Sequence, residues 1–199
     1  IRSRSQELER QVTSRTRELA ALNAIAAVVS RSLDTQQILT DALDKTLEVT
    51  GLEAGGIYLL QDSASCGGDE GILRVVAQRG LSAELIEGTD NLVVGEGFSG
   101  RVVQTGKPLV VGDLTTDPRL TRPVVRDSGY RFVAIAPLIS RGTICGTLFA
   151  MTRGETQFTQ QDVELHSSIG VQIGVAIENA RLFSAEQRRA EQFRLINRV

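Results

Sequence analysis

The chain begins and ends with long stretches in which apolar residues recur at alternating steps of four and three. In residues 1–33 this seam contains one charged residue, Arg15, and otherwise consists of Leu8, Val12, Leu19, Leu22, Ala26, Val29 and Leu33. In residues 159–199 it contains one polar residue, Gln187, and otherwise consists of Ile169, Ile173, Ala176, Ala180, Phe183 and Ala190. Such spacing predicts helices that pair with another helix. The alternative for the first stretch is an amphipathic helix lying on its own domain. Its polar first half favours a partner helix.

The residues between the two seams predict a small α+β domain. Asp34 is a suitable N-cap for a helix over residues 35–50, and Gly51 can end that helix. Apolar runs bounded by turn residues predict strands at 54–61, 72–78, 108–111, 131–140 and 143–153. A short helix is expected at 98–104, and a helical turn at 123–127 within a long loop. Both faces of the 131–140 run are apolar, so this strand should be central and covered on both sides.

Composition narrows the function classes. Apolar residues make up 41% and charged residues 23%, and a net charge of -2 gives no basis for binding nucleic acid. No apolar run approaches the roughly 18 residues that a membrane span requires. The polar first residues do not resemble a secretory signal, and two cysteines do not make a disulfide framework, so a cytoplasmic setting is expected. The absence of an initial Met predicts a piece of a longer protein.

Several motifs, in this order, resemble the GAF domain family, small sensor modules of signalling proteins such as bacterial sensor histidine kinases. They are Gly95-Glu96-Gly97 with Gly100, Thr105-Gly106-Lys107-Pro108, Asp113, Asp117-Pro118-Arg119, Pro137-Leu138, Gly142 with Gly146, Phe158 with Asp162, and Ala176-Ile177-Glu178-Asn179-Ala180. The resemblance covers about residues 22–183. It implies a GAF/PAS-like central antiparallel sheet of about six strands, with the long terminal helices packed on one face and extending as coiled coil.

The resemblance also implies a division of the chain and a place for a ligand. Residues 1–33 would be a coiled-coil linker helix, 34–183 the GAF domain with its first helix starting at about residue 22, and 184–199 a second linker leading toward another module. A ligand pocket is implied on the sheet face opposite the terminal helices. The expected ligand-binding residues are Ile57, Phe98, Val111, Asp113, Leu120, Val124, Tyr130 and Ala134. For most of them, plain core packing is the equal alternative.

Known ligands and cofactors of the family find little support. Where cyclic-nucleotide-binding members carry Asn-Lys, Phe and Asp-Glu, this chain has Thr152-Arg153, Phe158 and Asp162-Val163, so Arg153 could still pair with Asp162. The alternative is a purely structural role, in which Phe158 anchors the start of a helix and Asp162 supplies negative charge to its first turn. The loop of residues 114–130 has no Cys or His for a covalent bilin, and haem is disfavoured because the lone His166 lies on the last helix. No cofactor and no metal site are expected.

The resemblance leads to two competing functions. The first is a regulatory sensor that binds an unidentified small molecule and signals through dimeric helices to an output domain of the same chain. The second is a ligand-free dimerisation spacer whose pocket is filled by Phe98, Leu120 and Tyr130. An enzyme, such as the methionine sulfoxide reductases of the family, is not expected from Cys66 in a loop and Cys145 in a strand. A parallel homodimer is expected, with Leu8, Val12, Leu19, Leu22, Ala26, Val29, Ile173, Ala176, Ala180 and Phe183 at its interface.

Overall fold

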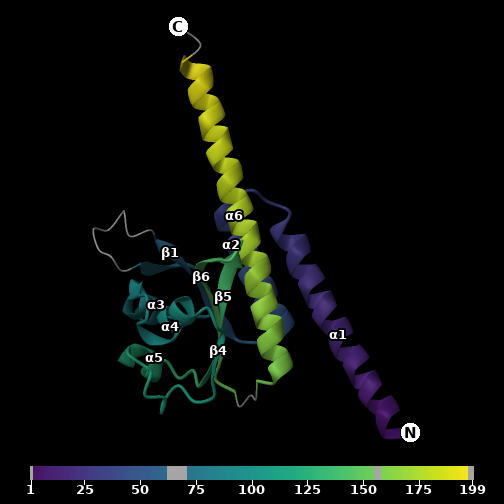
Figure 1. Ribbon diagram of the computed structural model, residues 1–199. Coiled ribbons are helices and arrows are strands. Elements are labelled where there is room, and N and C mark those ends of the chain that lie inside the picture. The colour runs from purple at the N-terminus through teal and green to yellow at the C-terminus, as the bar shows by residue number, and fades with distance from the viewer. Residues whose placement is uncertain (1, 62–70, 155–157, 197–199) are drawn as a thin grey trace.

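A six-stranded antiparallel sheet lies at the centre of the computed structural model, which describes residues 2–61, 71–154 and 158–196 (Figure 1). Its order is β3-β2-β1-β6-β5-β4, with the longest strands in the middle. The bounds are β1 Ala54–Gln61, β2 Ile72–Arg79, β3 Leu92–Val93, β4 Leu109–Val111, β5 Phe132–Ser140 and β6 Thr143–Thr152. The predicted α+β class and antiparallel sheet are confirmed. The loop that contains Cys66 lies outside the described residues.

Helices cover both faces of the sheet, and the two sets differ in length. One face carries the long helices α1 (Arg2–Val29), α2 (Thr35–Thr50) and α6 (Gln160–Ile196). The other carries the short helices α3 (Ala83–Thr89), α4 (Gly97–Thr105) and α5 (Pro123–Asp127) together with the loop of residues 112–131. None of the helices among the described residues is long and apolar enough to cross a membrane.

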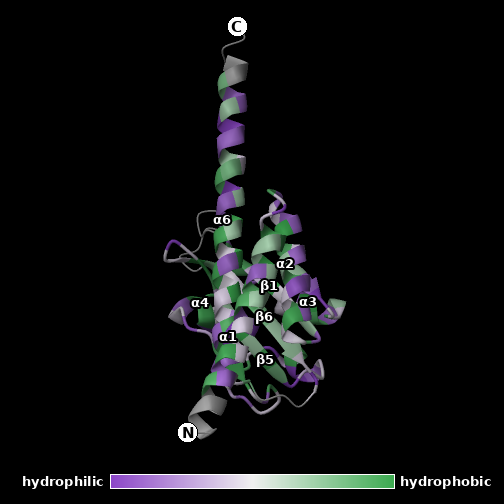
Figure 2. Ribbon diagram, turned by 90° about the vertical axis from the view of Figure 1, so that its right-hand side faces the viewer, coloured by the Kyte–Doolittle hydropathy of each residue, from purple (hydrophilic) through white to green (hydrophobic). Residues whose placement is uncertain are grey.

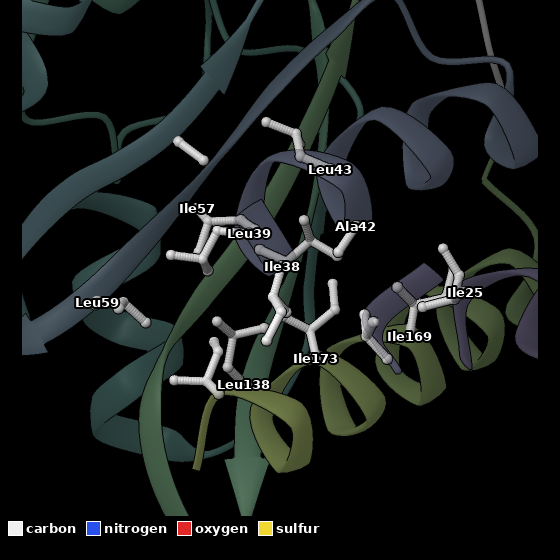
Figure 3. Close-up of a cluster of buried hydrophobic side chains, with 14 of the residues drawn as sticks. Ile25, Ile38, Leu39, Ala42, Leu43, Ile57, Leu59, Leu138, Ile169 and Ile173 are labelled. Carbon is white, nitrogen blue, oxygen red and sulfur yellow. The ribbon is translucent and has the colours of Figure 1, made fainter. Parts of the chain in front are cut away.

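The larger core fills the space between the sheet and the long helices (Figure 3). Each helix contributes one apolar stripe, and the strands contribute every second residue. The most enclosed side chains are Ile25, Ile38, Leu39, Leu43, Ile57, Leu138, Leu148, Ile169, Ile173 and Ile177. The helix α6 approaches β5 closely because it presents glycines there. A Cβ on Gly174 would lie 2.6 Å from the carbonyl oxygen of Ile139.

A second core lies between the sheet and the short helices. Tyr58, Val133, Ile135, Phe149 and Met151 point into it from the strands that feed alternate residues to the first core. The β5 strand is therefore covered on both sides, as its two apolar faces predict. Alternation along β5 sends Ala134, Ala136 and Leu138 toward α6.

The local start and stop signals explain most element boundaries. The Asp34 carboxylate accepts hydrogen bonds from Gln36 N at 2.8 Å and Gln37 N at 3.3 Å, and Gly51 ends α2 in the left-handed conformation. The first helix stops at Val29, four residues before the predicted end at Leu33. The last turn tightens there, since the N–H of Ser30 still donates to the carbonyl of Ala26 at 3.1 Å whereas the N–H of Arg31 donates to the carbonyl of Val28, only three residues back, at 3.2 Å.

The helices α1 and α6 run parallel and in step. Near the start of both helices, the Ser14 hydroxyl donates to Gln161 Oε1 at 2.7 Å, across a separation of 147 residues. Further along, Val29 and Ala176, which have the same separation in sequence, line one groove. At its far end α6 leaves the domain, while the start of α1 leaves it in the opposite direction (Figure 1). The two linker ends are thus at opposite ends of one helical layer.

The expected dimer interface is partly wrong. Val29, Ile173 and Ala180 are buried in the core of their own chain, and Leu22, Ala26 and Ala176 are half-buried beside them. Leu8, Val12, Leu19 and Phe183 are exposed. A spacing of three and four residues shows that a helix has an apolar face, but it does not show whether a sheet or another chain covers that face.

Candidate functional site

A cavity of about 70 Å³, the Phe98 cavity, lies in the second core, between the sheet and the short helices. Its floor is made by side chains of β1, β5 and β6, and its walls by α3, α4 and the loop of residues 112–131. Most of its lining is apolar: Tyr58, Leu81, Leu85, Leu92, Phe98, Leu114, Leu120, Val125, Val133, Ile135, Phe149 and Met151. The polar contributors are Thr89, Ser99, Thr121 and Arg122.

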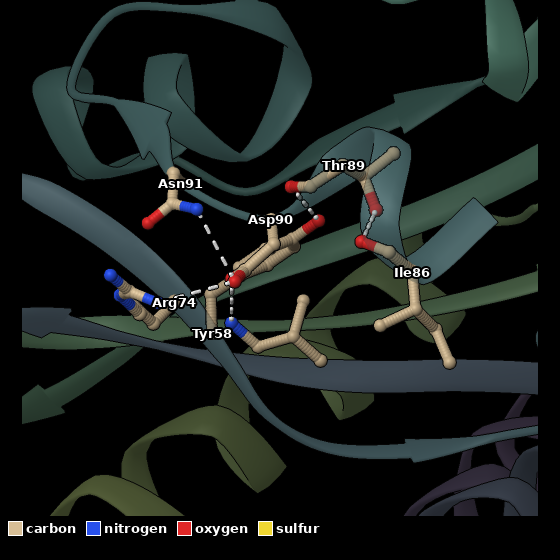
Figure 4. A network of polar contacts seen from close by, with 7 residues as sticks. Tyr58, Arg74, Ile86, Thr89, Asp90 and Asn91 are labelled. Atoms are coloured by element: carbon tan, nitrogen blue, oxygen red, sulfur yellow. Dashed lines mark hydrogen bonds and ion pairs between the residues drawn. The ribbon is translucent and has the colours of Figure 1, made fainter. Parts of the chain in front are cut away.

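Hydrogen bonds attach the α3 wall to the sheet (Figure 4). The Tyr58 hydroxyl donates to the carbonyl of Thr89 at 3.0 Å, and burial raises the pKa of this phenol to about 12. Next to it, the Asp90 carboxylate accepts from the backbone N–H of Val75 at 3.1 Å and pairs with Arg74 at 3.5 Å. The end of α3 is therefore held to β1 and β2, and Tyr58 remains a neutral donor at physiological pH.

The first turn of α4 opens onto the cavity. Gly97, Phe98 and Ser99 all line it, and Gly97 has a φ of 58°, which favours glycine. The first N–H groups of a helix lack partners within the helix, and the Glu96 side chain at the N-cap does not bond to them. Glu96 instead accepts from Arg122 Nε at 2.7 Å and from the backbone of Val93 at 3.2 Å. The bond from Arg122 lowers the pKa of the Glu96 carboxyl.

Two of the expected ligand-binding residues line the cavity, Phe98 and Leu120. Phe98 is nearly buried, and the guanidinium of Arg119 lies 5.8 Å from its ring centroid. Arg119 is itself held by a two-pronged pair with Asp117, with contacts of 2.9 and 2.6 Å. The motif Asp117-Pro118-Arg119 thus shapes the loop that covers Phe98.

Two of the expected residues are on the wrong face of the sheet. Ile57 belongs to the core under α2, and Ala134 lies under α6. Their neighbours in sequence, Tyr58, Val133 and Ile135, line the cavity instead. The prediction failed because both faces of these strands are apolar, so the alternation could not indicate which face looks toward the short helices.

The other four expected residues are near the cavity but do not line it. Val111 is buried in the same core, and Val124 packs on α3 against Gly88. Asp113 accepts from the Thr115 hydroxyl at 2.6 Å, a bond that lowers its pKa, and so shapes a turn. Tyr130 donates to the carbonyl of Gly80 at 2.6 Å under the guanidinium of Arg153, 4.0 Å from the ring centroid.

The sequence reasoning missed most of the lining. Leu85 and Leu92 lie outside the elements that the sequence predicts, and Leu114 and Val125 lie in its predicted long loop. Phe149 and Met151 come from a strand whose two faces the sequence pattern does not distinguish. The available signal was the alternation in β6, where Phe149 and Met151 are larger than Ala150. Arg122 could have been singled out as a cation that precedes Pro123 at a helix start.

The residues considered for methionine sulfoxide reduction and for cyclic-nucleotide binding do not line this cavity. The Cys145 thiol packs on the core under the long helices, 3.4 Å from the carbonyl of Leu138, and burial raises its pKa. Arg153 pairs with Glu53 at 3.5 Å, so the suggested pair with Asp162 is wrong. Asp162 accepts from the backbone and hydroxyl of Thr159 at 2.8 and 2.7 Å, as a first-turn carboxylate does. Across the described parts of the chain, no three His, Cys, Asp or Glu side chains gather as metal ligands would.

His166 occupies a separate place under α6. Only 3% of it is exposed, and it lines a cavity together with Phe158, Asp162 and Leu165. Neither ring nitrogen has a hydrogen-bond partner within the described ranges. Burial lowers the pKa of the imidazole to about 4, an effect that the nearby carbonyls of Leu148 and Ala134 partly oppose. His166 is on the opposite side of the sheet from the Phe98 cavity.

Comparisons with known proteins agree with this geometry. The chain is 30% identical over 196 residues to a Nif-specific regulatory protein of Azospirillum lipoferum, which covers 94% of this chain and 30% of the relative. It is 24% identical over 182 residues to the sensor histidine kinase YhcY of Bacillus subtilis, covering 89% of this chain and 46% of the relative. The chain thus spans less than half the length of these relatives.

Solved structures share the fold. A GAF domain from a phosphoenolpyruvate-protein phosphotransferase of Coxiella burnetii matches with a TM-score of 0.69 and 22% identity, covering 85% of this chain and 98% of the other. Free methionine-R-sulfoxide reductase of Neisseria meningitidis, solved with its substrate, matches with a TM-score of 0.68 and 24% identity, covering 83% and 90%. The GAF domain family profile matches residues 32–178. The chain therefore belongs to the GAF domain family, and the two sequence relatives named above are a regulatory protein and a sensor kinase.

Proposed function

We propose that this GAF domain is the sensor segment of a longer signalling protein and takes a small molecule into the Phe98 cavity. The observation that carries the proposal is the polarity of that cavity. The chamber is apolar with one polar end, where Ser99, Thr121 and Arg122 lie around the first turn of α4. This is the usual arrangement of a small-molecule site.

The polar end suggests the chemistry of the ligand. Free N–H groups at a helix start favour a hydrogen-bond acceptor or an anion, and Arg122 adds a positive charge at the same side. Arg122 is engaged by Glu96, so an incoming carboxylate would compete with Glu96 for the guanidinium. We therefore expect a ligand with a compact apolar body and one acceptor or carboxylate group.

The size of the cavity sets a condition on binding. Ligand pockets usually have roughly 300–1,000 Å³, whereas this one has about 70 Å³. A metabolite can therefore enter only when Leu120 and Val125 on the covering loop move outward. Such a movement would link occupancy to the shape of the domain.

The strand β5 gives a route from the cavity to the signalling helix. Val133 and Ile135 line the cavity, while Ala134 between them lies under α6 on the opposite face. A ligand that changes the position of β5 would shift α6 against the sheet. The signal requires that the ligand bind two arrangements of this helix with different affinity. The output domain would be among the parts of the longer protein that this chain does not span.

A ligand-free spacer is the second candidate, and the small cavity volume is the observation that favours it. Phe98 and Leu120 already occupy much of the space that a ligand would need. In that case the domain would only hold two helices at a fixed distance and angle.

Ligand screening by thermal unfolding separates the two candidates. Small carboxylic acids would be compared with their amides, since a ligand at about 100 times its Kd stabilises the fold by about 2.7 kcal/mol. Sensing predicts that one acid raises the Tm, that Leu120→Phe abolishes the shift, and that Leu109→Phe preserves it. Leu109 is half-buried in the same core but does not line the cavity. No shift with any compound, and no small molecule in native mass spectra, would favour the spacer.

We infer a regulatory rather than a catalytic role for the cavity. The one cysteine among the described residues, Cys145, is on the other face of the sheet and has a raised thiol pKa. A turnover assay with free methionine sulfoxide and a thiol reductant should give no product above background. Product formation that is lost in Cys145→Ser would contradict this inference.

A further inference from the structure

The cavity lined by His166, the His166 cavity, lies on the sheet face that the long helices cover. It has a volume of about 140 Å³ and lies between the end of α2, the start of α6 and β5. Figure 2 shows the side of the molecule on which α1, α2 and α6 cover the sheet. The residues that line the cavity are Val49, Thr50, Leu52, Ala134, Phe158, Asp162, Leu165 and His166. Since a cavity of roughly 150 Å³ can hold benzene, this one has room for a small molecule.

His166 brings an unsatisfied imidazole to this cavity. The side chain is almost fully buried, and neither ring nitrogen has a hydrogen-bond partner among the described residues. Because burial lowers its pKa to about 4, the ring is neutral at physiological pH, so one nitrogen carries a proton and the other an accepting lone pair. The nearby carbonyls of Leu148 and Ala134 are themselves acceptors and cannot donate to that lone pair. The ring therefore needs a donor that the described part of the chain does not supply.

The other polar side chains of the lining also act as acceptors. The Thr50 hydroxyl gives its proton to the carbonyl of Thr46 at 2.7 Å, which leaves its oxygen lone pairs to accept. Asp162 Oδ2 accepts from the N–H and hydroxyl of Thr159, whereas Oδ1 accepts no hydrogen bond within the described ranges. A cavity whose polar groups are acceptors selects a molecule that carries several donors.

The charges around the cavity favour a positive ligand. Val49 and Thr50 belong to the last turn of α2, whose unpaired carbonyls form the negative end of the helix dipole. This turn contains no basic residue that would offset them. The start of α6 has the opposite sign, but Asp162 lies in its first turn. Phe158 adds an aromatic ring, and such rings attract ammonium and guanidinium groups.

A groove between α1 and α6 adjoins the cavity and gives a route of entry. The residues that line both are Val49, Asp162 and Leu165. The groove has two further carboxylates, Glu9 and Glu18, and one guanidinium, Arg17. Glu18 is paired with Arg15 at 2.7 Å. Even with Arg15 counted, the carboxylates outnumber the guanidinium groups, so the groove attracts a cation more than an anion.

We propose that the His166 cavity binds a small organic cation with N–H donors, of the ammonium or guanidinium type. The ligand donates to the His166 lone pair, to the Thr50 hydroxyl and to Asp162, and its charge offsets the end of α2. It ties α2 to the start of α6. A metal ion fits less well, because no three His, Cys, Asp or Glu side chains gather in the described parts of the chain. The proposal does not depend on any ligand in the Phe98 cavity, which lies across the sheet.

NMR of the natural chain tests the binding, because His166 is its only histidine and gives a single set of imidazole signals. The probe is ethylammonium at neutral pH and constant ionic strength. Tetramethylammonium has the same charge without N–H donors, and ethanol is a donor of similar size without the charge. Ethylammonium should shift the imidazole signals saturably, with a millimolar Kd because it has so few atoms. The two comparison compounds should bind at least about tenfold more weakly.

Three outcomes of this titration would overturn the proposal. The first is no saturable shift with ethylammonium or guanidinium, which would mean that water alone fills the cavity. The second is equal binding of ethanol or tetramethylammonium, which would mean that charge and donors are not recognised together. The third is a saturable shift with zinc chloride and none with the organic cations, which would make this a metal site.

Variants assign the binding to this cavity. Asp162→Asn removes the charge but keeps an oxygen for Thr159, and it should raise the ethylammonium Kd about tenfold. Glu164→Gln removes the same charge from an exposed side chain of α6 outside the cavity, and it should leave the Kd within about twofold. Thr50→Val removes one acceptor at nearly constant volume and should also weaken binding. Circular dichroism checks that each variant folds. Equal effects of Asp162→Asn and Glu164→Gln, or an unchanged Kd in both cavity variants, would refute this site.

Discussion

Acid should destabilise this domain through a single side chain, His166. The imidazole is buried under α6 with a pKa lowered to about 4, whereas in the unfolded chain it has its ordinary value of about 6.5. Between these two pH values the unfolded state binds a proton that the folded state does not. The protonation of His166 therefore leaves the free energy of unfolding unchanged well above pH 6.5 and reduces it progressively as the pH falls toward 4.

The size of the effect follows from the two pKa values. Linkage gives a loss of about 1 kcal/mol at pH 6, about 2 kcal/mol at pH 5 and about 3 kcal/mol at pH 4. The chain has no other histidine. The carboxyls with lowered pKa, such as Glu96 and Asp117, lose their contribution only below about pH 4.5. The window between pH 5 and 6.5 thus belongs to His166.

Urea unfolding followed by circular dichroism at pH 7.5, 6.5, 6 and 5 measures the loss, with His166→Gln as the comparison. The variant should show a flat free energy over this window, while the natural chain falls by about 2 kcal/mol. An NMR titration of the single imidazole should give a midpoint below 5. Parallel pH profiles for the two proteins, or a midpoint near 6.5, would refute the idea that burial without partners keeps the ring neutral.

Three further substitutions probe the packing by urea unfolding. Gly174→Ala should destabilise by about 1–3 kcal/mol because its Cβ meets the β5 backbone; Gly112→Ala, which meets nothing within 4 Å, is the control and should stay within about 0.5 kcal/mol. Asp34→Ala should cost about 1 kcal/mol through loss of the α2 cap, and Asp34→Ser should restore most of it. Tyr58→Phe should cost about 1–2 kcal/mol because it leaves the Thr89 carbonyl without its buried donor. Unchanged midpoints would mean that these contacts do not bear on stability.

The sequence alone determined the class of fold and most element boundaries. Local chemistry acts within a few residues, so Asp34 and Gly51 could be recognised as the ends of a helix, and apolar runs could be recognised as strands. The order of glycines and polar motifs around residues 95–119 then identified the family, which the profile match confirms.

Only the tertiary structure decided which face each residue serves. Ile57 and Tyr58 are neighbours in sequence, yet one packs under the long helices and the other lines the cavity. Likewise, Ile173 and Val175 both belong to apolar stripes of α6, and only contact with the sheet buries the first and leaves the second exposed. Periodicity gives the angle between side chains around one element. It does not give the angle of that element to its neighbours, because long-range packing sets that angle.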